Sequence, residues 1–135
     1  MRAVLDPNVI VSALLSPQGA PAKILSMWLG GAFELVISPK VIDETRRVLG
    51  YSKIRKRISE EEAGEAIHVL LGRGSPTEDP TALPSIRSSD PVNDYLIALA
   101  EASAAALVSG DSDLLELNSD LPIYSPRAFL ELIRD

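Results

Sequence analysis

The sequence predicts an α/β protein in which a central parallel sheet lies between two layers of helices, a three-layer α/β/α arrangement. Short apolar runs alternate with helical segments along the chain, which is typical of right-handed βαβ units. The runs at 3–5 and 106–109 are almost wholly apolar, as in strands buried on both faces. A length of 135 residues, with 46% hydrophobic and 24% charged residues, predicts one globular domain over 1–135.

The first half of the chain is expected to form two strand–helix units. Asn8 is a candidate N-cap for the helix after the first strand, and Gly30 ends the second helix. Ser38, with Pro39 at the first helical position, begins a helix that Gly50 stops. The expected elements are a strand at 3–5, helices at 9–15 and 20–29, a strand at 33–37 and a helix at 38–49.

The second half repeats this alternation after one irregular stretch. Ser59 and Glu62 form a capping box, and Asp90 or Asn93 caps a later helix. Ser125 precedes a proline and begins the last, amphipathic helix. The expected elements are a helix from 59 to about 71, a loop at 72–89 with room for an edge strand, a helix through 94–100, a strand at 106–109, a helix at 111–117, a strand at 122–124 and a final helix.

Composition excludes several classes of protein. The chain has no cysteine, which excludes disulfides, zinc–thiolate sites and cysteine nucleophiles, and His68 is its one histidine. A net charge of −6 excludes a wholly basic nucleic-acid-coating protein. No apolar run approaches the roughly 18 residues of a membrane span, and no signal-peptide pattern precedes the first strand. We therefore expect a cytoplasmic protein without membrane association, whose chemistry rests on carboxylates.

Acidic residues follow the expected strands. Asp6 comes directly after the first strand, and Asp111 and Asp113 follow the strand at 106–109 across a glycine. In open α/β sheets, ligands bind beyond the carboxyl ends of the strands. Glu44 and Asp94 lie near the starts of helices that begin at this edge. We expect Asp6, Glu44, Asp94 and Asp111 to converge there.

Such a cluster calls for a cation. Neighbouring carboxylates raise one another's pKa, and a divalent ion removes that conflict. Hard oxygen ligands suit Mg²⁺ or Mn²⁺, which can activate water and neutralise charge on a phosphodiester. Taken singly, each acid also has an ordinary structural interpretation: Asp6 in a turn, Asp90 and Asp111 as helix caps, Glu44 as a solvated helix residue. The hypothesis depends on the joint arrangement.

Four blocks of the sequence resemble PIN-domain proteins, in particular the branch that contains toxins of toxin–antitoxin systems, the VapC-like ribonucleases. They are VLDPNVIVSALL at 4–15, LVISPKVIDE at 35–44, DPVNDYLIALA at 90–100 and LVSGDSDLL at 107–115. Their order and spacing hold over nearly the whole chain. The resemblance implies a PIN fold and a Mg²⁺- or Mn²⁺-dependent ribonuclease, usually a homodimer and often held inactive by an antitoxin.

The resemblance also implies roles for individual residues. Asp6, Glu44, Asp94 and Asp111 match the four acids that bind metal and catalyse hydrolysis, with Asp113 as an auxiliary acid. Asn8 and Ser109 match polar neighbours that orient the acids or water. The sequence departs from the family at Pro7, where threonine is usual, and at 93–94, where relatives often have two acids or the reverse order. The third acid is therefore either Asp94 or Asp90.

A basic segment begins beside the acids. Residues 40–57 contain seven of the chain's thirteen lysines and arginines but only two of its nineteen acids. An acidic site that cleaves a polyanion needs such compensating charge. We expect RNA phosphates to bind Arg46, Arg47, Lys53, Arg55, Lys56 and Arg57. A solvated helix face, or a seat for an acidic antitoxin tail, would give the same pattern.

Two other functions compete with a ribonuclease. Receiver domains and haloacid-dehalogenase-like phosphatases also have an aspartate after the first strand, but they need a lysine late in the chain, and the last lysine here is Lys56. The second alternative is a PIN-like module that binds nucleic acid or protein without turnover. Pro7 is the feature that favours it, because proline lacks the hydroxyl and the backbone N–H that threonine offers a ligand.

Overall fold

The computed structural model describes residues 1–134 and contains one five-stranded sheet. The strand order is β3-β2-β1-β4-β5, and all four neighbouring pairs are parallel. The expected parallel sheet is therefore confirmed. The expected domain of residues 1–135 ends at Asp135, which lies outside the described residues. The strands are β1 (Arg2–Leu5), β2 (Glu34–Ile37), β3 (Ser75–Pro76), β4 (Ala106–Val108) and β5 (Ile123–Tyr124).

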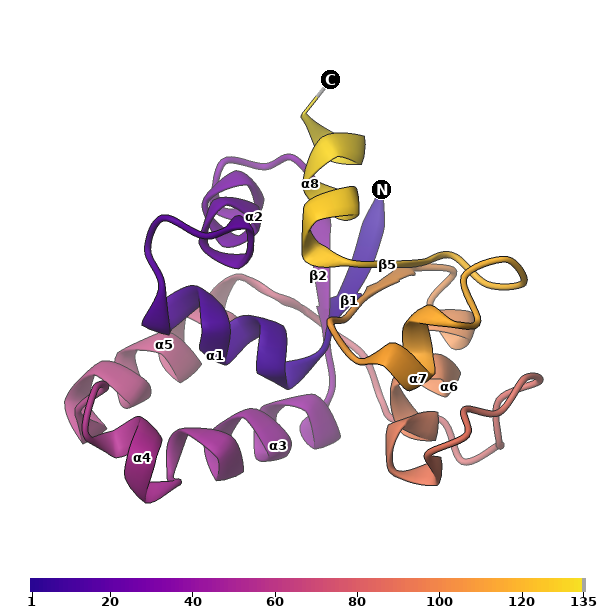
Figure 1. Ribbon diagram of the computed structural model, residues 1–135. Helices are drawn as coiled ribbons and strands as arrows, with labels where there is room; N and C mark the ends of the chain where they lie inside the picture. The colour runs from indigo at the N-terminus through magenta and orange to yellow at the C-terminus, as the bar shows by residue number, and fades with distance from the viewer. Residues whose placement is uncertain (135) are drawn as a thin grey trace.

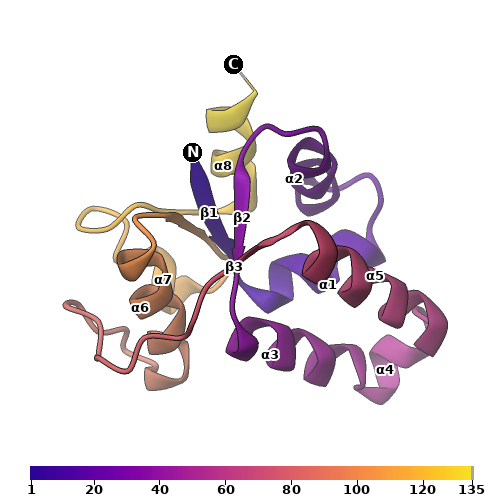
Figure 2. The same cartoon turned by 180° about the vertical axis from the view of Figure 1, so that it is seen from behind.

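Helices cover the sheet on both faces. Figures 1 and 2 show α1 to α5 on one side of the strands and α6 and α7 on the other, which confirms the three-layer arrangement. The helices are α1 (Pro7–Leu15), α2 (Ala20–Leu29), α3 (Pro39–Leu49), α4 (Ser52–Arg55), α5 (Glu60–Arg73), the 3₁₀ turn η1 (Pro91–Asn93), α6 (Asp94–Ala102), α7 (Ser112–Leu115) and α8 (Pro126–Ile133). Helix α4 was not expected from the sequence.

The strand order locates the point where a ligand would bind. The chain passes from β1 outward to β2 and β3, and then crosses to β4 and β5 on the other side of β1. The direction of winding thus reverses between β1 and β4. In open parallel sheets, ligands bind in the crevice at the carboxyl ends of such a strand pair.

Helix caps show where local sequence decides structure. Ser38 accepts the backbone N–H of Val41, and Ser59 and Glu62 form both hydrogen bonds of the capping box. The expected cap at Asn8 is wrong: Asp6 is the N-cap of α1, and its Oδ1 accepts the Asn8 N–H at 3.0 Å. Asp6 precedes a proline at the first helical position, where the missing N–H costs nothing.

The other open choice of cap is resolved by the short turn before α6. Asp90 caps η1 by accepting the Val92 N–H, whereas the Asn93 side chain makes no capping hydrogen bond. Asn93 is thereby free to bond elsewhere.

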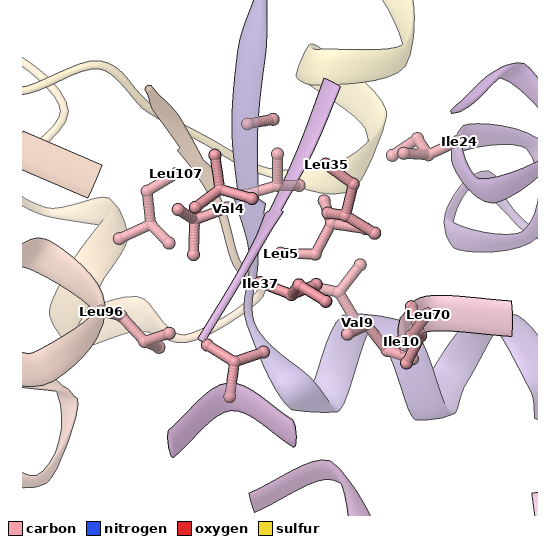
Figure 3. Packing of buried hydrophobic residues seen from close by; sticks show 14 of the residues in the cluster. Val4, Leu5, Val9, Ile10, Ile24, Leu35, Ile37, Leu70, Leu96 and Leu107 are labelled. Atoms are coloured by element: carbon pink, nitrogen blue, oxygen red, sulfur yellow. The ribbon is translucent and has the colours of Figure 1, made fainter. Parts of the chain in front are cut away.

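The core lies on both faces of the sheet. Figure 3 shows Leu96 and Leu107 to one side of β1 and β2, with Ile10 and Ile24 to the other. Trp28 is buried in the same core. Among residues 1–134, no helix is both long and apolar enough to cross a membrane. The packed strands hold the residues at their carboxyl ends in fixed positions.

Candidate active site

The register of two neighbouring strands brings the first two site residues together. Leu5 of β1 pairs with Val108 of β4, and the Asp6 N–H continues the ladder to the Val108 carbonyl at 2.9 Å. Asp6 and Ser109 therefore leave adjacent strands side by side, at the reversal point between β1 and β4. The Ser109 hydroxyl donates to Asp6 Oδ2 at 2.7 Å.

Asp6 is a buried carboxylate that is only partly compensated. Its residue is 5% exposed, and its two oxygens accept hydrogen bonds from the Asn8 N–H and the Ser109 hydroxyl. Burial raises the pKa of Asp6 above its ordinary value, the two hydrogen bonds oppose that rise, and the charge of Asp111 adds to it. A nearby cation would remove this electrostatic cost.

Ser109 connects the two acids. While donating to Asp6, its Oγ accepts the Asp111 backbone N–H at 3.0 Å. Asp111 then caps α7 by accepting the Asp113 N–H at 2.8 Å through Oδ1, and its Oδ2 accepts the Asn93 amide at 3.2 Å. One hydroxyl and one amide thus fix Asp111 between β4 and η1.

Asp6 lies between two cavities. The first, the α1–β4 cavity, has a volume of about 320 Å³ and is lined by residues that include Asp6, Asn8, Ser12 and Asp111. The second, the α3–α6 cavity, has about 270 Å³ and is lined by residues that include Asp6, Asn8, Glu44, Arg47, Tyr51, Val92 and Asn93. Asn8 is exposed and borders both cavities, so its amide can reach a molecule bound in either.

Glu44 shares the α3–α6 cavity with Asp6 but has a counterion of its own. Both of its carboxylate oxygens accept hydrogen bonds from Arg47, the shortest at 2.7 Å from Nη2. These bonds lower the pKa of Glu44. Arg47 also hydrogen-bonds the hydroxyl of Tyr51, which lies just beyond the end of α3. Glu44 is therefore ionised and bound to a side chain that could exchange it for a phosphate.

Asp94 is buried, and its carboxylate accepts two hydrogen bonds. It is 6% exposed; Oδ2 accepts Arg87 Nε at 2.7 Å, and Oδ1 accepts the Ser88 N–H at 2.9 Å. It does not line either cavity beside Asp6. Asp90, the other candidate for the third acid, caps η1 and donates its N–H to the Ser88 hydroxyl.

The carboxylate of Asp113, the expected auxiliary acid, is hydrogen-bonded to Ser89. Its Oδ1 accepts the Ser89 hydroxyl at 3.1 Å, and that hydroxyl also lies 3.0 Å from Glu116 Oε1. Only the backbone N–H of Asp113 contacts the Asp111 carboxylate.

The four acids thus converge less tightly than the sequence suggests. Within residues 1–134, no three acidic or histidine side chains gather closely enough to hold a metal ion. Asp6 and Asp111 are linked through Ser109, Glu44 borders the same crevice, and arginines neutralise Glu44 and Asp94. The donors still fit Mg²⁺ or Mn²⁺ in kind, because all are hard oxygens and the buried Asp6 carries uncompensated charge.

The six expected phosphate-binding residues are all exposed. Arg47 lies at the acidic cavity, while Arg46 and Arg55 border a separate hollow of about 330 Å³ together with Glu60. Helix α4, which carries Lys53 and Arg55, lies at the end of α3 away from α6 and α7 in both Figures 1 and 2. The basic residues therefore extend from the acids outward along α3 and α4.

Three residues at the site were missed by sequence reasoning. Arg87 is the only lysine or arginine between Arg73 and Arg127, an isolation that could have suggested a specific partner. Asn93 stands next to Asp94 in a block already singled out. Tyr51 carried no signal, since an exposed and a buried tyrosine look alike in sequence.

A family model for the PIN domain matches residues 2–113, and the chain therefore belongs to the PIN-domain family. Proteins with PIN domains are generally nucleases. All four acids of the candidate site lie within the matched residues, and the PIN-like fold that the sequence blocks implied is confirmed.

Individual proteins are similar to this chain over nearly its whole length. The uncharacterized protein MJ1680 of Methanocaldococcus jannaschii is 27% identical over 141 residues, which cover 97% of this chain and 90% of that protein. The crystal structure of PAE2754 from Pyrobaculum aerophilum has a TM-score of 0.67 at 16% identity, covering 98% of this chain and 89% of that one. VapBC2 from Rickettsia felis, bound to a DNA fragment from its promoter, has a TM-score of 0.59 at 17% identity, covering 93% and 98%.

Proposed function

We propose that this PIN-domain protein is a metal-dependent endoribonuclease that hydrolyses RNA phosphodiester bonds, and that it is the toxin of a toxin–antitoxin pair. The observation that carries the proposal is the Asp6–Ser109–Asp111 linkage at the reversal point of the sheet. Its acids are hydrogen-bonded into place, open to two cavities, and bordered by the exposed bases of α3 and α4.

Asp6 and Asp111 are the residues that would hold the cation, with Glu44 and Asp94 as the further ligands that the family resemblance implies. A bound Mg²⁺ or Mn²⁺ would lower the pKa of a water molecule and neutralise charge that develops on the phosphate. Ser109 keeps the Asp6 carboxylate in one orientation, and Asn93 does the same for Asp111. The exposed Asn8 amide is positioned to orient water or substrate.

Basic side chains bind the substrate. Arg47 can transfer its paired N–H groups from Glu44 to a phosphate oxygen, because a guanidinium binds both anions in the same forked manner. That exchange frees Glu44 beside Asp6. Lys53, Arg55, Lys56 and Arg57 would bind flanking phosphates, so affinity for RNA should fall with salt. Water is the nucleophile, and no covalent intermediate is required.

The test is cleavage of single-stranded and structured RNA in Mg²⁺ or Mn²⁺, compared with chelator. Asp6→Asn and Asp94→Asn serve as controls for a contaminating nuclease. We expect metal-dependent cleavage that both substitutions abolish. Cleavage that persists in both variants would belong to a contaminant. Loss in Asp90→Asn together with retention in Asp94→Asn would identify Asp90 as the third acid.

A binding module without turnover is the second candidate function, and one observation favours it. Arginines already neutralise Glu44 and Asp94, two of the four acids. Such a protein would bind RNA or an acidic peptide in Mg²⁺ and leave RNA intact at every enzyme concentration. Pro7 occupies the first position of α1, where the helix itself needs no N–H, and it still lacks the hydroxyl and free N–H that threonine would offer a ligand there.

The partners proposed are an antitoxin and a second copy of the chain. The structurally similar VapBC2 of Rickettsia felis is a complex bound to its promoter DNA, which supports a partner protein of that kind. For the homodimer, Trp28 is unsuitable as an interface residue because it is buried within the chain, whereas Leu71 of α5 is exposed. A mass of about 14.5 kDa by light scattering at micromolar concentration would exclude the dimer.

A further inference from the structure

We propose that the α3–α6 cavity is a subsite for one unpaired nucleobase, with Tyr51 and Val92 as the two walls that hold it. This inference rests on the proposed function, since it concerns the nucleotide next to the phosphate that is cleaved. It also names side chains by which the protein could select one RNA segment over another. The acidic residues alone offer no such choice, because every phosphate along an RNA chain is alike.

The first observation is the exposure of two apolar side chains that line the cavity from different elements. Tyr51, which follows α3, is 41% exposed, and Val92 of η1 is 72% exposed. Both line the cavity that contains Asp6 and Glu44. Figure 1 shows α3 and α6 on different sides of the strand ends, so the two walls come from separate parts of the fold. An aromatic ring and an aliphatic side chain can cover the two faces of a planar base.

The second observation is that Tyr51 is held in place by a charged neighbour. Arg47 hydrogen-bonds the Tyr51 hydroxyl, and its guanidinium carbon lies 5.5 Å from the ring centre. The ring therefore has a defined orientation although it is exposed. A preorganised ring loses little conformational freedom when a base stacks on it. The same arginine supplies positive charge for the phosphate attached to that nucleotide.

The third observation is the composition and size of the cavity. Pro7, Val48 and Leu96 supply further apolar lining, and Asn8 and Asn93 supply side-chain amides. At about 270 Å³ the cavity lies just below the roughly 300–1,000 Å³ of typical small-molecule pockets, which suits a single ring system better than a longer segment. A base inside a duplex is covered on both faces by its neighbours, so it can enter only when unstacked.

The cavity also has the right connection to the acids. Asp6 and Asn8 border both the α3–α6 cavity and the α1–β4 cavity, where Asp111 lies. A base held between Tyr51 and Val92 would therefore direct its own phosphate toward Asp6. The subsite predicts cleavage next to an unpaired nucleotide and weak cleavage of fully paired RNA.

Binding can be tested without catalysis. A single-stranded RNA that contains one 2-aminopurine is titrated with the protein in chelator, and stacking is detected as fluorescence quenching. We expect quenching by the parent protein, about tenfold weaker binding in Tyr51→Ala, and near-parent binding in Tyr51→Phe, which keeps the ring. Val92→Ser should weaken quenching, whereas Leu83→Ala, which removes an equally exposed apolar side chain outside the cavity, should not.

Cleavage gives an independent readout. The parent protein should cut an RNA with a normal base at the preferred position much faster than the same RNA with an abasic residue there. Tyr51→Ala should raise KM more than it lowers kcat, because the acids are untouched. Equal cleavage of normal and abasic RNA, or unchanged quenching in Tyr51→Ala, would overturn the subsite and leave the ribonuclease proposal intact. A parent protein that cleaves no RNA in Mg²⁺ or Mn²⁺ would instead overturn the proposed function, whatever the quenching shows.

Discussion

The Ser109 hydroxyl donates to Asp6 Oδ2 across 2.7 Å, and it is completely buried. These residues are 103 positions apart in sequence, yet each directly follows a strand, and the two strands are paired in register. The parallel pairing of β1 and β4 is therefore what creates the hydrogen bond. Because Ser109 also accepts the Asp111 N–H, this one side chain determines how two acids lie relative to each other.

Replacing Ser109 by alanine should destabilise the fold. It leaves a buried carboxylate oxygen of Asp6 and the Asp111 N–H without their partner, at a cost of about 1–3 kcal/mol in the free energy of unfolding. It also removes a hydrogen bond that lowers the pKa of Asp6, so that pKa should rise further. Urea unfolding measures the first effect, and titration of the Asp6 carboxyl by NMR measures the second.

Ser103 provides the matched control. It is also buried, but its hydroxyl has no hydrogen-bond partner in the part of the chain that the structure describes. Ser103→Ala removes a buried hydroxyl that has no hydrogen bond to lose, so it should leave the free energy of unfolding unchanged or raise it. Equal losses in Ser109→Ala and Ser103→Ala would mean that the Asp6 hydrogen bond contributes nothing specific.

Asp6→Asn should stabilise the protein in chelator at neutral pH. The folded pKa of Asp6 is raised, so the native state holds its proton over a pH range in which the unfolded chain has released it. Stability from this group is thus greatest below the ordinary aspartate pKa and falls as pH rises through the folded pKa. Removing the charge should raise the free energy of unfolding by on the order of 1 kcal/mol at pH 7, and this gain should shrink as the pH falls.

Divalent cations should make the parent protein more stable than Asp6→Asn. Mg²⁺ or Mn²⁺ bound to the native state raises its stability by roughly 2.7 kcal/mol when the ion is present at 100 times its Kd. We expect the parent Tm to rise with metal and the Asp6→Asn Tm to stay constant. A metal-induced rise of equal size in both proteins would remove Asp6 from the set of ligands.

Local chemistry explains which parts of this structure the sequence predicts. The strands that end just before Asp6 and Ser109, and the helix starts at Ser38 and Ser125, depend on neighbouring residues. The structure has them within one or two positions of the expected ones. The wrong cap at Asn8 has a local cause as well. Asp6 and Asn8 are both good caps, and the proline between them favours the residue that precedes it.

Contacts between distant segments could not be predicted in the same way. The sequence indicates that Asp94 stands at the start of a helix, but its partner Arg87 comes from an irregular stretch that has no periodic pattern to fix its path. Tyr51, after α3, and Val92, in η1, line the same cavity although they belong to segments connected to different strands of the sheet. Such relationships depend on sheet order, which the alternation of strands and helices leaves open.

Gly64 inside α5 and Gly74 just after its end should respond oppositely to alanine. A Cβ at Gly64, inside the helix, would meet no heavy atom within 4 Å, so Gly64→Ala should stabilise by about 0.5–1 kcal/mol through helix propensity. A Cβ at Gly74 would lie 2.6 Å from the Leu70 carbonyl oxygen and 3.0 Å from Ile37, so Gly74→Ala should destabilise and disturb β3. Thermal unfolding of the two variants measures both effects, and the same sign in both would contradict this account of α5.

Arg87 and Asp94 should show energetic coupling. Arg87→Ala leaves the buried Asp94 carboxylate with the Ser88 N–H as its remaining hydrogen-bond donor. This should lower the free energy of unfolding by about 1–2 kcal/mol. The value lies between those for exposed and buried ion pairs because Arg87 is half exposed. Asp94→Asn should cost less, since an amide oxygen can still accept the Ser88 N–H and Arg87 can turn to water. The double variant should fall short of the sum by at least about 0.5 kcal/mol.

Breaking the same ion pair tests whether Asp94 binds metal or has a structural role. If Asp94 is a ligand, Arg87 competes with the cation for its carboxylate, and Arg87→Ala should enlarge the Mg²⁺- or Mn²⁺-induced rise in Tm relative to the parent. Arg73→Ala is the matched control, because Arg73 is an exposed arginine that hydrogen-bonds the Leu29 carbonyl, far from the acids in sequence. A metal-induced rise that is the same in the parent, Arg87→Ala and Arg73→Ala would show that Asp94 serves α6 and its loop rather than the metal.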